Sequence, residues 1–100
     1  MRGAIASVEI YALPPGEAAP RARRLTLTIT APERDRDAMG GWTCRVALAD
    51  LHPPETIRAE DSVAALAGAL ARARVWIDAI RAQGSLLTRD RAGESAFFLD

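Results

Sequence analysis

Cys44 and His52 are the residues of this chain whose types could support covalent catalysis. The chain has one cysteine and one histidine. A nucleophilic thiol needs an adjacent base and a lowered pKa. The segment that joins the two residues has the alternating pattern of a strand, and eight residues of straight strand span about 26 Å. We therefore expect Cys44 to pack as a small apolar side chain and His52 to lie in an exposed loop, and we predict no catalytic residue.

Other site chemistry has no matching motif. One cysteine and one histidine cannot form a zinc tetrad without carboxylates, and the chain has neither a glycine-rich phosphate loop nor a G-x-S-x-G motif. We expect no metal and no cofactor. Thirteen basic residues, all arginine, balance thirteen acidic ones, which disfavours a dedicated nucleic-acid binder. Arg21, Arg23 and Arg24 form a small basic cluster, so weak nucleic-acid binding is the least favoured of three hypotheses.

A ligand pocket between sheet and helix is the basis of the second hypothesis. Two tryptophans and two polar side chains could converge there: Trp42, Arg45, His52 and Trp76. A deep pocket with converging polar groups would favour a ligand-binding or enzymatic domain, and a tightly filled layer would count against it. The sequence does not identify the ligand.

Residues 60–84 form the longest periodic segment and predict a helix. Asp61 or Ser62 suits the N-cap, and Gly84 suits the left-handed position that ends many helices. A step of 100° per residue places one apolar stripe on the helix, with Ala69 and Trp76 at its edge. We expect this stripe to cover a sheet and Leu70→Asp to prevent folding. The stripe consists of Val63, Leu66, Leu70, Ala73, Ile77 and Ile80.

The opposite side of this helix carries a second stripe of small, uncharged residues. It consists of Ala64, Gly68, Ala71, Val75, Ala79 and Ala82. Small side chains allow two helices to approach closely, which indicates a contact with a second copy or another protein. The alternative is compositional, because alanine is common in this chain and is the best helix former. Gly68 and Val75 are poor choices for an exposed helix, so both interpretations stay open.

Three segments before the helix alternate as strands do. They are residues 4–13, residues 23–30, with Leu25, Leu27 and Ile29 facing inward, and residues 42–50, with Trp42, Cys44, Val46 and Leu48 facing inward. Residues 31–41 read as a charged loop. His52-Pro53-Pro54 should end the third strand, and residues 55–59 could add a short edge strand. After the helix, residues 86–89 and 95–99 could form a hairpin.

This order of elements predicts an α+β fold with one domain over residues 1–100. The expected architecture has two layers, an antiparallel sheet of about four to six strands and one long helix in the C-terminal half. About half of the residues are apolar, and no stretch reaches the length of a membrane span. The lone cysteine and the absence of a signal-peptide pattern favour the cytoplasm. The abundance of alanine and arginine is typical of a high-GC bacterium.

Two motifs resemble a family of small bacterial domains of unknown function. The strand Trp42-x-Cys44 resembles the W-x-C strand of that family. Asp61-Ser62-Val63-x-Ala65-Leu66 resembles its G-x-D-S-x-Q-A-L helix start, although Ala64 stands where glutamine is usual. The resemblance implies a strand-rich domain with one helix and implies no activity.

Our leading hypothesis is a non-enzymatic interaction domain, a homodimer or the binder of a small protein partner. Its contact surface would be either the small-residue stripe or an exposed sheet edge. We expect Ala71→Glu with Val75→Arg to leave the fold intact and to weaken assembly if the stripe is the contact.

Overall fold

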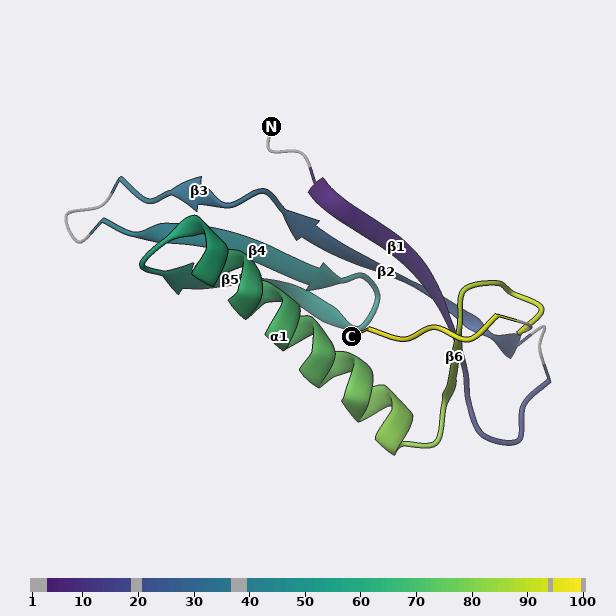
Figure 1. The fold of residues 1–100 in the computed structure, drawn as a ribbon. Helices are drawn as coiled ribbons and strands as arrows, with labels where there is room; N and C mark the ends of the chain where they lie inside the picture. The colour runs from purple at the N-terminus through teal and green to yellow at the C-terminus, as the bar shows by residue number, and fades with distance from the viewer. Residues whose placement is uncertain (1–3, 19–20, 37–39, 94, 100) are drawn as a thin grey trace.

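The computed structural model describes residues 4–18, 21–36, 40–93 and 95–99 (Figure 1). The elements follow one another as β1 (Ala4–Leu13), β2 (Arg23–Thr30), β3 (Glu33–Arg34), β4 (Trp42–Leu48), β5 (His52–Ala59), α1 (Ser62–Ala82) and β6 (Leu86–Thr88). The strands form one sheet of six. One helix lies against this sheet, so the predicted two-layer α+β fold is confirmed.

The sheet is antiparallel, and its centre is β4. One edge of β4 pairs with β5, and its other edge pairs with β2 and then with β3. β2 pairs in turn with β1, and β1 pairs with β6 over Tyr11–Leu13. Across the sheet the order is therefore β5, β4, β2 with β3, β1 and β6, which makes β5 and β1 with β6 the two borders.

The alternation of the strands decides which side chains enter the core. Leu25, Leu27 and Ile29 of β2 are buried as predicted, and the threonines between them lie on the opposite face of the sheet. In β4 the buried positions are Cys44, Val46 and Leu48, while Trp42 is half-buried at the start of the strand. One face of the sheet thus forms the core layer, and the other remains a polar face rich in threonine.

Two strands differ from the prediction. Within the segment expected to be a charged loop, Glu33 and Arg34 pair with the beginning of β4. His52-Pro53-Pro54 was expected to end a strand, but β5 already begins at His52. Proline is tolerated there because β5 is bonded to β4 on one edge only, so a missing N–H need not disrupt the sheet.

The helix begins and ends where its sequence signals predict. Asp61 is the N-cap, and its Oδ1 accepts a hydrogen bond from the backbone N–H of Ala64 at 2.7 Å. At the other end, Gly84 has φ +93°, a conformation that glycine adopts without strain, and its N–H donates to the carbonyl of Arg81. Arg72 ties the helix to β5 through an ion pair with Glu55 at 3.3 Å.

The predicted buried stripe of α1 is wrong at its N-terminal half. Val63 is 75% exposed and Leu70 is 42% exposed, whereas the helix buries Ala65 and Ala69 instead. Ala73, Trp76, Ile77 and Ile80 complete the buried face. The helix is rotated toward β5 relative to the prediction, because alanines on its sheet side allow its backbone to approach β4 and β5 closely. Leu70 is left on the flank that faces β2 and β1, whereas Leu66 is half-buried and packs against the core as predicted.

The C-terminal segment forms the predicted hairpin in a short form. The N–H of Phe97 donates to the carbonyl of Leu87, and Thr88 bridges to Ala96. Phe97 is buried, Phe98 is exposed, and Leu99 packs partly against the core. The segment then runs between α1 and the β1–β2 side of the sheet (Figure 1), where the guanidinium of Arg81 donates to the carbonyl of Phe97.

Candidate interaction surface and candidate pocket

β1 has a free edge over Ala4–Ile10. Within the described part of the chain, its second edge is paired only over Tyr11–Leu13, where β6 lies. In an antiparallel strand, alternate backbone groups point to each side. About half of the N–H and C=O groups of Ala4–Ile10 therefore point away from β2, toward solvent. One register irregularity, between Ala4 and Ala6, interrupts this edge.

The two borders of the sheet differ in how they discourage another strand from pairing. β5 carries Pro53, Pro54 and the charged residues Glu55 and Arg58, all of which disfavour edge-to-edge association. The free edge of β1 has the sequence AIASVEI, with no proline and one charge, Glu9. The guanidinium of Arg24 lies 3.8 Å from that carboxylate. The β1 edge is therefore the border that can accept a strand.

An apolar groove of about 140 Å³ adjoins this edge. We call it the β1 groove, and its lining residues are Ala6, Ser7, Val8, Leu27, Ile29, Leu70 and Leu99. It lies where α1 does not cover the inner face of β1 and β2, so the exposed flank of the helix forms one of its walls. No lining residue is charged. The groove and the edge residues Ala4–Val8 together form one continuous uncharged surface.

One residue of the small-residue stripe of α1, Gly68, packs against β5 within the chain. A Cβ on Gly68 would lie 2.6 Å from Cγ2 of Ile57 in β5, so glycine is required there for close helix–strand packing. Ala64, Ala71, Val75, Ala79 and Ala82 are exposed. The stripe is thus a solvent-facing surface with a structural explanation for its glycine.

The four residues of the predicted pocket do not line one cavity. His52 stacks on Trp76, with ring centroids 4.6 Å apart and an interplanar angle of 6°. Trp42 is at the opposite end of β4 from Leu48, the residue that pairs with His52, a separation of about 20 Å along the strand. Arg45 is exposed on the other face of the sheet. His52 is therefore a packing partner of Trp76 and does not belong to an exposed loop.

Cys44 is placed as a core residue. It is buried, and its Sγ donates to the carbonyl of Thr30 at 3.1 Å. Burial raises the pKa of the Cys44 thiol above its usual value of 9.0, although the hydrogen bond to Thr30 lowers it. His52 pairs with Leu48, four positions further along β4 and about 13 Å away, so this histidine does not adjoin the thiol. A buried thiol with a raised pKa is a poor nucleophile.

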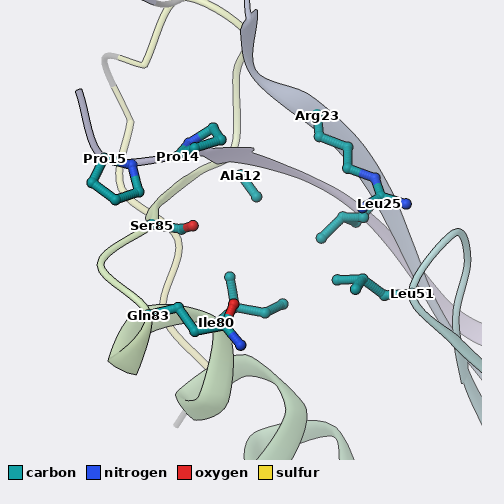
Figure 2. A pocket seen from close by; sticks show the side chains of 9 residues that line it. All are labelled: Ala12, Pro14, Pro15, Arg23, Leu25, Leu51, Ile80, Gln83 and Ser85. Carbon is teal, nitrogen blue, oxygen red and sulfur yellow. The ribbon is translucent and has the colours of Figure 1, made fainter. Parts of the chain in front are cut away.

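A second hollow, of about 290 Å³, lies between the end of α1 and the sheet (Figure 2). Its walls come from the β1–β2 connection, the β4–β5 turn and the segment after the helix. The lining is mainly apolar, with three polar side chains, and consists of Ala12, Pro14, Pro15, Arg23, Leu25, Leu51, Ile80, Gln83 and Ser85. The guanidinium of Arg23 donates to the carbonyl of Asp50, which fixes it at the rim. We call this hollow the helix-end cleft.

The basic cluster of the sequence is only partly available to a polyanion. Arg23 donates to Asp50, and Arg24 faces Glu9. The ring of Tyr11 is covered by the guanidinium of Arg91, 5.0 Å from the ring centroid, so that face of the ring cannot stack on a base. These contacts give nucleic-acid binding no support.

The β1 groove and the helix-end cleft could not be predicted from the sequence, because both are made by segments far apart in the chain. The excess of apolar residues on α1 was the available signal for the groove: Val63, Leu66, Leu70, Trp76 and Ile77 span a wider sector than one sheet face covers. Among the described residues, no group of three or more His, Cys, Asp and Glu side chains could hold a metal ion. The described helix is too polar to cross a membrane.

Comparisons of the chain with protein-family models, with curated proteins and with solved structures give no match.

Proposed function

We propose that this protein is a non-enzymatic interaction module that accepts an extended strand of another polypeptide on the free edge of β1. The observation that carries the proposal is the difference between the two sheet borders. β5 has prolines and charges along its edge, whereas Ala4–Val8 has neither. Strand addition takes its affinity from backbone hydrogen bonds and its specificity from pockets for alternate side chains, and the β1 groove is such a pocket.

The burial pattern supports the same surface. Leu70 is 42% exposed and forms one wall of the groove, and a partner that covers it removes apolar surface from water at about 25 cal/mol per Å². The small-residue stripe is the other candidate contact. Its exposed members are mostly alanine, which presents little apolar area, and its glycine is already explained by Ile57. The edge and groove are therefore the stronger candidate.

A labelled peptide tests the proposal directly. The peptide carries the sequence of Ala4–Leu13 and is titrated with the protein while its fluorescence anisotropy is measured. We expect saturable binding, because an added strand can pair with the free edge. The matched control is the same peptide with alternate amides N-methylated, which we expect to bind at least about tenfold more weakly. Absence of binding to a chain that has the monomer mass under the conditions of the titration, or equal binding of both peptides, would contradict the proposal.

The helix-end cleft favours a second function, binding of a small molecule. Its apolar lining with Arg23, Gln83 and Ser85 at the rim suits a mainly apolar ligand that carries a hydrogen-bond acceptor. Saturation-transfer NMR with benzamide and benzoate as probes tests this function. We expect a signal that disappears in Leu51→Trp, which fills the cleft, and persists in Val75→Trp. No signal from either probe would contradict it.

A further inference from the structure

We infer that the strand accepted by β1 is β1 of a second copy, so that two chains pair about a two-fold axis at Ser7. The inference rests on the proposed function and names its partner. An antiparallel pairing of identical strands is self-complementary, because each residue i meets residue j while j meets i. The resulting sheet would continue through both chains, with both helices on the same face.

The length and the position of the free edge fit this symmetry. The outer edge of β1, the edge away from β2, is unpaired over Ala4–Ile10 and is paired with β6 from Tyr11 onward. Ser7 is the midpoint of this unpaired segment. Pairing about Ser7 sets Ala4 opposite Ile10 of the second copy and Ala6 opposite Val8. Ala6, Ser7 and Val8 pair regularly across the axis, and the register irregularity between Ala4 and Ala6 lies next to each end of this central part. The pairing ends at Tyr11, where β6 takes over the edge of β1 in each chain.

The charge pattern also permits pairing with itself. Glu9 is the only charged residue of the free edge. About an axis at Ser7 it faces the uncharged Ile5 of the other copy, so no like charges lie directly opposite each other. The apolar side chains of Ala6 and Val8 face the uncharged β1 groove. An identical surface can therefore meet this one without electrostatic repulsion.

Native mass by sedimentation equilibrium tests the inference in three chains. We expect the wild type to have twice the chain mass at high micromolar concentration. Ser7→Arg places two like charges opposite each other on the axis, and we expect it to have the chain mass. Thr56→Arg adds the same charge to the exposed face of β5, at the other border of the sheet, and we expect it to remain a dimer.

Two outcomes overturn the inference. A wild type that has the chain mass throughout the concentration range excludes the dimer, and a dimer that survives Ser7→Arg excludes the axis at Ser7. Circular dichroism of Ser7→Arg confirms that the variant is folded, as expected because Ser7 is exposed. Peptide binding distinguishes failure of the dimer from failure of the proposed function. If the protein is a monomer that binds the unmodified peptide, only the dimer is contradicted. If it is a monomer that binds no peptide, the proposed function is contradicted as well.

Discussion

Gly68 is the residue at which local helix preference and tertiary packing conflict. Alanine stabilises a helix interior by about 1 kcal/mol relative to glycine. Here an added Cβ would lie 2.6 Å from Cγ2 of Ile57, well inside contact distance. Because Ile57 is β-branched and held in β5, its side chain has few ways to move aside. The glycine therefore sets how closely α1 approaches β5.

Gly68→Ala should consequently lower the free energy of unfolding. We expect the overpacking cost of roughly 1–3 kcal/mol to exceed the gain in helix preference of about 1 kcal/mol. In an Ile57→Ala background the clashing atom is absent, so the same substitution should be neutral or stabilising. Urea denaturation of the four chains measures this coupling. A stabilising effect of Gly68→Ala in the wild-type background would contradict the packing described for the helix.

Cys44 gives a pH dependence whose sign follows from burial. The pKa of its thiol is raised above 9.0 in the folded chain. Below pH 9 the thiol is neutral in both the folded and the unfolded chain, so its burial contributes fully to the free energy of unfolding. Above about pH 9 the unfolded thiol ionises while the folded thiol keeps its proton, and the free energy of unfolding falls until the folded pKa is passed. We expect Cys44→Ala to remove this part of the fall, as measured by urea denaturation between pH 7 and pH 11. Parallel curves for the two chains would contradict a buried thiol.

At the scale of the element, the ends of α1 could be predicted from the sequence, but the face of the helix that packs on the sheet could not. Asp61 and Gly84 act locally, through hydrogen bonds and backbone conformation within a few residues, and their roles can be read from the sequence. The buried face depends on which strands lie beneath the helix. Leucine is more apolar than alanine, so periodicity favoured Leu66 and Leu70, whereas the close approach to β4 and β5 selects Ala65 and Ala69.

A pair of aspartate substitutions distinguishes the observed face from the predicted one. Ile77 is fully buried, and Leu70 is 42% exposed at the wall of the groove. We expect Ile77→Asp to prevent cooperative folding, because an unpaired carboxylate is costly in the core. Leu70→Asp should still fold, contrary to the expectation from periodicity alone. Thermal melting followed by circular dichroism measures both, and loss of folding in Leu70→Asp would restore the predicted stripe.

At the scale of the whole molecule, the fold class and most of the strands could be predicted from the sequence, although β3 and the start of β5 could not. Alternation placed Leu25, Leu27 and Ile29 in the core, and a single long helix allowed only one covered sheet face. A border strand over residues 55–59 was predicted and lies within β5. The order of the other strands could not be predicted in the same way, because it depends on long-range pairing. The free edge of β1 can be identified only from the structure, in which the pairing of β1 with β6 ends at Tyr11.

The same long-range dependence explains the candidate sites. The predicted pocket combined residues by chemical type, and the register of β4 with β5 separates Trp42 from His52. The β1 groove brings together residues from both ends of the chain, Val8 and Leu99, with Leu70 between them. No local pattern links such positions. The resemblance to a bacterial family of unknown function stays a prediction.

The central claim is that the edge of β1 receives another strand, and backbone hydrogen exchange of that strand tests it most directly. Exchange is measured at low and at high micromolar concentrations, and the border strand His52–Ala59 serves as the internal reference. The account predicts that amides of Ala4–Ile10 become protected as the concentration rises while those of His52–Ala59 do not change. Exchange of Ala4–Ile10 that is equally fast at both concentrations would contradict it.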